Sequence, residues 1–127
     1  MSRSDGGPVD GRRKLLIVDD SDDIRMVLEF FFKDKGYEVR MAQSGDEAVA
    51  IASEFRPDVV LLDHNIPGLS GIDTFKTLRR FDPKLRVIVL SASDPEEAAA
   101  EVLQSGVDRY VCKSADLEQL DRIIREL

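Results

Sequence analysis

The sequence predicts an α/β fold: a doubly wound, five-stranded parallel sheet with helices on both faces. Three apolar runs carry this prediction, at residues 15–18, 59–62 and 87–90. Each run is continuous and does not alternate with polar residues, which is the pattern of strands that are buried on both faces of a sheet. Segments with apolar residues at helical spacing lie between the runs. This alternation indicates parallel strands joined by right-handed crossovers.

The first strand and the first helix form the clearest pair. After the run at residues 15–18, a helix is expected whose apolar face consists of Ile24, Val27, Leu28, Phe31 and Phe32. Gly36 lies where a glycine commonly ends a helix, and a weaker strand is expected over residues 37–41. Helix packing explains the aromatic run at residues 30–32 better than a ligand site does, and one of its three side chains must face outward.

The second helix has its own start signal. Ser44 and Glu47 have the spacing of a capping box, so a helix is expected from there to about Phe55. The strong strand at residues 59–62 follows. The repeated order of strand and helix then places a further helix before the strand at residues 87–90.

The last part of the chain repeats this order. Residues 94–97 combine a capping aspartate, a first-turn proline and two glutamates, so a helix is expected there that ends near Gly106. A weaker strand is expected over residues 109–112. The final helix has Ser114 as its expected N-cap, and its apolar face consists of Leu117, Leu120, Ile123, Ile124 and Leu127.

Length, charge and cysteine content limit the classes of function. The 127 residues correspond to one domain, with residues 1–13 expected to form a disordered polar tail before a folded domain at residues 14–127. The net charge of −7 argues against direct binding to nucleic acid. No apolar stretch approaches the roughly 18 residues that span a membrane. The single cysteine, Cys112, excludes an internal disulfide and favours a reducing, cytoplasmic location.

Polar residues follow the carboxyl ends of the expected strands, where open α/β sheets bind ligands. These residues are Asp19, Asp20 and Asp22 after the first strand, Asp63, His64 and Asn65 after the third, Ser91 after the fourth and Lys113 after the fifth. Neighbouring carboxylates repel each other. A divalent cation with oxygen ligands, such as Mg²⁺, removes that repulsion. A carboxylate can also accept a phosphoryl group, with a lysine to pair with its charge.

At these residues the sequence resembles the receiver domain of bacterial response regulators. The matching pieces are Val18-Asp19-Asp20, residues 62–68 (Leu-Asp-His-Asn-Ile-Pro-Gly) with Gly71, Leu90-Ser91-Ala92, and Gly106 with Tyr110 and Lys113. Each piece alone is weak, but together they occur in order, each at a strand end. The resemblance covers about residues 14–127. It implies a flavodoxin-like sheet with strand order 2-1-3-4-5.

The resemblance also implies a catalytic and metal site. Asp63 would be the phosphoacceptor. Asp20 and Asp63 would bind Mg²⁺ directly, together with the backbone carbonyl of Asn65, while Asp19 would act through water. Lys113 would pair with the phosphoryl oxygens. Such a domain catalyses only its own phosphorylation and dephosphorylation, so no separate substrate is expected.

A switch is implied as well. The hydroxyl of Ser91 would turn onto the phosphoryl group, and Tyr110 would rotate inward in response. Asn65 and Ser93 would flank the acceptor and tune the lifetime of the phosphate. Most relatives have a proline after the lysine, with a cis bond before it, whereas this chain has Ser114. Because a cis bond to a non-proline residue costs about 3–4 kcal/mol, a trans bond or a strained cis bond is expected.

The implied partners are a sensor histidine kinase or a histidine phosphotransfer protein, and a downstream effector. The pair Lys113-Ser114 is similar to receivers that precede helix-turn-helix output domains. A monomer or a phosphorylation-promoted dimer is expected, with no direct contact to nucleic acid or membrane.

Simpler interpretations stay open beside these roles. Asp20 could cap the first helix, Asp63 could be a turn residue, and Tyr110 could serve packing alone. His64 is expected to be a loop residue that points away from Asp63, and Cys112 a small buried apolar side chain. The alternative function is a receiver-like interaction module that is not phosphorylated. A flavin or phosphatase site is disfavoured, because acids follow the first strand and residue 65 is asparagine.

Overall fold

A computed structural model of the chain describes residues 13–64, 66, 70–91, 106–112 and 116–127. Five parallel strands form one sheet in the order β2-β1-β3-β4-β5, which confirms the predicted order. The strands are β1 (Lys14–Val18), β2 (Glu38–Ala42), β3 (Val59–Asp63), β4 (Arg86–Ser91) and β5 (Arg109–Cys112). All five expected strands are therefore present, each within one residue of its predicted bounds.

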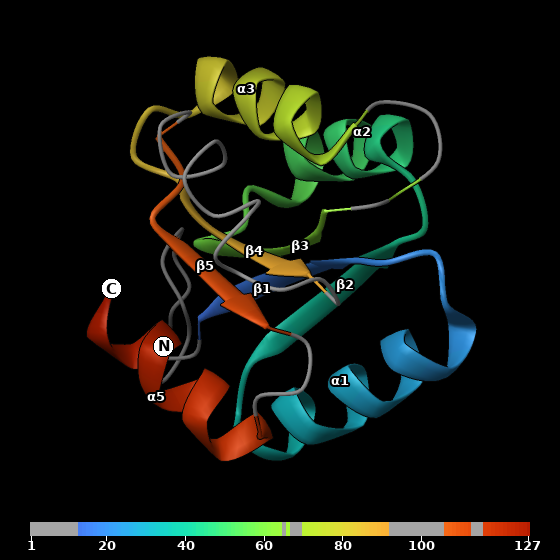
Figure 1. The fold of residues 1–127 in the computed structure, drawn as a ribbon, viewed down its shortest axis with the longest axis vertical. Coiled ribbons are helices and arrows are strands. Elements are labelled where there is room, and N and C mark those ends of the chain that lie inside the picture. The colour runs from blue at the N-terminus through green and yellow to red at the C-terminus, as the bar shows by residue number, and fades with distance from the viewer. Residues whose placement is uncertain (1–12, 65, 67–69, 92–105, 113–115) are drawn as a thin grey trace, which may run out of the picture.

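Helices cover both faces of the sheet, as predicted (Figure 1). The helices are α1 (Asp22–Asp34), α2 (Gly45–Phe55), α3 (Gly71–Phe81) and α5 (Leu117–Glu126). In Figure 1, α2 and α3 lie on one side of the strands, and α1 and α5 lie on the other. The helix expected after residues 94–97 falls outside the described residues. Within the described part of the chain, no helix has the length and apolarity to cross a membrane.

The core consists of two apolar layers, one on each face of the sheet. Successive residues of a strand point to opposite faces, so Leu15 and Ile17 belong to one cluster while Leu16 and Val18 belong to the other. All four side chains are at most 1% exposed. This two-sided burial is the physical reason why the central strands have continuous apolar sequences.

Helix ends confirm two of the sequence signals. Gly36 has φ +98° and ends α1, where the amide of Gly36 donates to the carbonyl of Lys33 and the amide of Tyr37 donates to that of Phe32. This pair of bonds is a Schellman motif. At α2, the Ser44 hydroxyl accepts from the amide of Glu47 at 3.1 Å, as a capping box predicts.

Two predictions about helix N-caps are wrong. Ser114 was the expected N-cap of the last helix, but α5 begins at Leu117 and its N-cap is Asp116, whose carboxylate accepts from the amide of Gln119 at 2.8 Å. An aspartate directly before the first helical turn is as good a cap as a serine. At α1, the N-cap is Ser21. The capping alternative for Asp20 is therefore wrong.

A buried polar pair joins the end of α1 to α5. The Tyr37 hydroxyl donates to the carboxylate of Asp121 at 2.7 Å, and Arg125 donates to the other oxygen of that carboxylate at 3.0 Å. Tyr37 is 7% exposed and Asp121 5%. Burial, together with the hydrogen bond to Asp121, raises the pKa of Tyr37 from 10.0 to about 12.

Alkaline titration is expected to reveal this pair. The raised pKa means that the neutral phenol is preferred in the folded state, so its stabilising contribution is complete below pH 10 and is lost as the pH rises through about 12. Tyr37→Phe is expected to lose about 1–3 kcal/mol of unfolding free energy at neutral pH. It should also remove the tyrosinate transition near pH 12 in an absorbance titration. A titration in which Tyr37→Phe leaves that transition in place would contradict the assignment.

Candidate functional site

The strand register brings the predicted acids together at one edge of the sheet. Val18, the last residue of β1, pairs with Leu62 in β3. Asp19 directly follows Val18 and Asp63 directly follows Leu62, so the two acids lie at the same edge of the sheet. Backbone hydrogen bonds continue past the strands: the amide of Asp19 donates to Ala42 at 3.0 Å, and that of His64 donates to Leu90 at 2.8 Å. Both acids are thus held by rigid backbone.

Three carboxylates converge at this edge. Asp19, Asp20 and Asp63 each offer an oxygen atom, and these atoms all lie within 4.8 Å of one another. Asp19 is 1% exposed and Asp63 3%, whereas Asp20 is exposed to solvent. The amide of Ser21 donates to the Asp19 carboxylate at 2.9 Å, which fixes the direction of that side chain. The cluster is therefore buried on one side and open at Asp20.

The donor set fits a hard divalent cation. Carboxylate oxygens are the ligands that Mg²⁺ and Ca²⁺ prefer, and Mg²⁺ commonly uses only one or two carboxylates beside water. Without a cation, three like charges within 4.8 Å destabilise one another. Asp20, as the exposed member, gives an ion access from solvent.

The start of α3 packs closely against the loop that follows β3. A methyl group added to Gly71 would lie 2.9 Å from the carbonyl oxygen of His64 and 3.1 Å from that of Asp63. These neighbours are backbone atoms and cannot rotate away as a flexible side chain would. The absence of a side chain at this position thus lets α3 support the Asp63 loop at short range.

Gly71→Ala is expected to disturb the site as well as the fold. Overpacking of this kind costs about 1–3 kcal/mol, and the forced shift of Asp63 should weaken Mg²⁺ binding, measured by calorimetric titration. Gly36→Ala is the control, because Gly36 has a positive φ but lies far from the cluster, at the other end of α1. That variant should lose stability and keep its metal affinity. Equal metal affinity in both variants would refute the supporting role of Gly71.

The remaining predicted site residues in the described regions lie nearby. Ser91 ends β4 fully buried, one residue after Leu90, which pairs with Asp63. Tyr110 lies in β5, its ring centroid 6.4 Å from that of His64, and it packs against the apolar cluster on the α2–α3 face. Its hydroxyl is buried and has no hydrogen-bond partner among the described residues. The ring is thus partly buried in this structure.

Several predictions fall outside the described residues or need qualification. Lys113, Asn65 and Ser93 lie outside them, as does the bond between Lys113 and Ser114; the described residues contain no cis peptide bond. Cys112 is half-buried, so it is less enclosed than expected.

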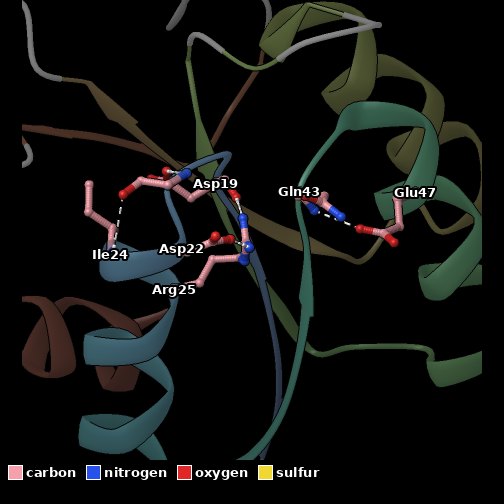
Figure 2. Close-up of polar contacts among 7 residues, drawn as sticks. Asp19, Asp22, Ile24, Arg25, Gln43 and Glu47 are labelled. Carbon is pink, nitrogen blue, oxygen red and sulfur yellow. Dashed lines mark hydrogen bonds and ion pairs between the residues drawn. The ribbon is translucent and has the colours of Figure 1, made fainter.

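Sequence reasoning missed one residue at this edge, Arg25. Its guanidinium donates to the backbone carbonyl of Asp19 at 2.6 Å and pairs with the carboxylate of Asp22 (Figure 2). The available signal was the i,i+3 spacing of Asp22 and Arg25 in the first turns of α1. That spacing alone does not indicate the contact to Asp19.

Comparison with known proteins agrees with this geometry. The sequence profile of the family described as the response regulator receiver domain matches residues 15–125. The chain is 34% identical over 113 residues to sporulation initiation phosphotransferase F of Bacillus subtilis (strain 168), which covers 89% of this chain and 91% of that protein. It is 36% identical over 112 residues to regulatory protein AtoC of Escherichia coli (strain K12), covering 88% of this chain but only 24% of AtoC.

A solved structure gives the same result. The receiver domain of the Francisella response regulator 1452 superposes with a TM-score of 0.84 at 31% identity, over 91% of this chain and 95% of that domain. The family match spans nearly the whole described fold, and the acid cluster lies at the predicted strand ends. The chain therefore belongs to the response regulator receiver domain family, the phosphotransfer-accepting switches of two-component signalling.

Proposed function

We propose that this chain accepts a phosphoryl group on Asp63 in a reaction that depends on Mg²⁺. The observation that carries the proposal is the convergence of Asp19, Asp20 and Asp63, with carboxylate oxygens within 4.8 Å of one another. Asp63 is the member at the end of the central strand β3, and its backbone is held by the hydrogen bond from His64 to Leu90. A fixed carboxylate beside a cation site is the arrangement that phosphoryl transfer to an aspartate needs.

The chemistry follows from this arrangement. A carboxylate oxygen of Asp63 attacks phosphorus, and the bond between phosphorus and the leaving group breaks in line with it. Bound Mg²⁺ supplies positive charge for the transferring oxygens. Asp20 and Asp63 are proposed as its direct ligands with the carbonyl of Asn65, Asp19 acts through water, and Lys113 pairs with the phosphoryl oxygens. Ser91 lies fully buried at the end of β4, one residue after Leu90, the strand partner of Asp63, and its hydroxyl is proposed to turn onto the new phosphoryl group.

The proposed donor is a phosphohistidine on a sensor kinase or on a histidine phosphotransfer protein in the cytoplasm. The phosphorus–nitrogen bond then breaks, and the histidine nitrogen leaves as the Asp63 acyl phosphate forms. The downstream partner is an effector, or an output domain of the helix-turn-helix type, that distinguishes the two states. The chain spans only 24% of AtoC. The functions of such longer relatives are therefore only proposals for this chain.

Intact-mass spectrometry tests the proposal directly. The protein is incubated with acetyl phosphate and Mg²⁺, and the mass is compared with that of a sample treated with EDTA and with that of Asp63→Ala. We expect one added phosphoryl group that requires both Asp63 and Mg²⁺. Labelling that persists in Asp63→Ala, or that is equal in EDTA, would refute the assignment.

A further inference from the structure

Arg25 joins the end of β1 to the beginning of α1. One terminal nitrogen of its guanidinium donates to the carbonyl oxygen of Asp19 at 2.6 Å. The other pairs with the carboxylate of Asp22. The Arg25 side chain is only 14% exposed, although Asp22 is 84% exposed. Figure 2 shows the guanidinium between Asp19 and Asp22.

The carbonyl that Arg25 contacts belongs to the peptide group between Asp19 and Asp20. A peptide group is planar, so a hydrogen bond that fixes its carbonyl also fixes the orientation of its amide, and hence the direction in which the next residue leaves the loop. On the other side, the amide of Ser21 holds the Asp19 carboxylate at 2.9 Å. The loop that carries both acids is therefore held at two points, the carbonyl of that peptide group and the carboxylate of Asp19.

We propose that Arg25 is a positioning residue of the cation site, acting through the Asp19 carbonyl on the carboxylates of Asp19 and Asp20. The proposal rests on the proposed function, because it assumes that these acids bind Mg²⁺. Arg25 is a partly buried cation, and its charge alone would weaken the binding of a metal cation nearby. A positive charge beside a cation site weakens metal binding by repulsion, so charge and positioning predict changes of opposite sign when Arg25 is removed.

The experiment measures Mg²⁺ affinity by calorimetric titration in the wild-type chain and in Arg25→Gln. If Arg25 acts mainly by its charge, Arg25→Gln removes a positive charge and leaves Asp22 unpaired, and both changes tighten Mg²⁺ binding. If Arg25 positions the acids, binding weakens, by about 10-fold or more for the loss of a group that orients ligands. The expected result is weaker binding. Equal or tighter binding would overturn the inference.

Three further variants separate the causes. Lys33→Gln makes the same charge change at the other end of α1, where Lys33 pairs with Glu29 at 2.8 Å, and should leave Mg²⁺ affinity within about twofold of wild type. Asp22→Asn with Arg25→Gln should keep the weakened binding, since the contact to Asp19 is what matters. Arg25→Lys keeps the charge with a single donor group, should fold if Arg25→Gln does not, and should also bind Mg²⁺ more weakly.

A second readout distinguishes positioning from a general loss of structure. Unfolding in EDTA reports the fold of each variant without the metal. Labelling by acetyl phosphate at increasing Mg²⁺ should require more Mg²⁺ in Arg25→Gln but reach the wild-type rate at saturation. A wild-type chain that binds no Mg²⁺ would refute the proposed function and this inference together. A wild-type chain that binds Mg²⁺ beside an Arg25→Gln variant of equal affinity would refute the inference alone.

Discussion

Mg²⁺ is expected to raise the unfolding free energy of the wild-type chain, and Asp20→Asn is expected to abolish that rise. A ligand that binds only the folded state stabilises it by about 2.7 kcal/mol at one hundred times its dissociation constant. Asp20 is the exposed member of the acid cluster, so it can be changed without creating a cavity. Without Mg²⁺, Asp20→Asn should instead be slightly more stable than wild type, because it removes one of three like charges.

The measurement is urea unfolding followed by circular dichroism, in EDTA and in saturating Mg²⁺, for each protein. Asp46→Asn is the matched control, since Asp46 is an exposed acid in the first turn of α2 and does not belong to the cluster. Mg²⁺ should raise the unfolding free energy of Asp46→Asn as much as it raises that of the wild type. A full Mg²⁺ effect in Asp20→Asn would place the cation somewhere other than at the acid cluster.

The sheet could be predicted because its central strands are buried on both faces. Burial on both faces removes polar residues from a strand, and the resulting run is visible in any single stretch of sequence, as at residues 59–62. The edge strand β2 is harder to recognise, because Glu38 and Arg40 are exposed and interrupt its pattern. Local capping signals worked where the cap and the capped amide are three residues apart, as in Ser44 and Glu47.

The acids of the site could be predicted for a related reason: parallel strands end at the same edge, so residues after β1 and β3 must meet there. Contacts that depend on how a helix packs against the sheet or another helix leave no comparable signal in the sequence. Tyr37 and Asp121 are 84 residues apart in sequence and meet only because α1 and α5 share a face of the sheet. The N-cap of α5 is ambiguous in the sequence, because Ser114 and Asp116 have similar capping preferences.

The aromatic run in α1 offers the largest expected change in stability. Phe32 is fully buried in the cluster on the α1–α5 face and packs edge-on against Tyr37 at 5.3 Å between ring centroids. Phe32→Ala should cost about 3–5 kcal/mol of unfolding free energy, a large part of the roughly 5–15 kcal/mol that holds a typical domain folded.

Phe30→Ala provides the matched control, because it is the same substitution two residues away in the same helix. Phe30 is 79% exposed, so it is the outward-facing member that the sequence required. Phe30→Ala should change the unfolding free energy by no more than about 0.5 kcal/mol, and the higher helix propensity of alanine favours the variant. Urea unfolding of both variants in EDTA compares them without any contribution from metal. Equal losses would mean that α1 does not pack on the sheet through the face that carries Phe32. A large loss in Phe32→Ala alone would establish that α1 packs on the sheet through the face that carries Phe32.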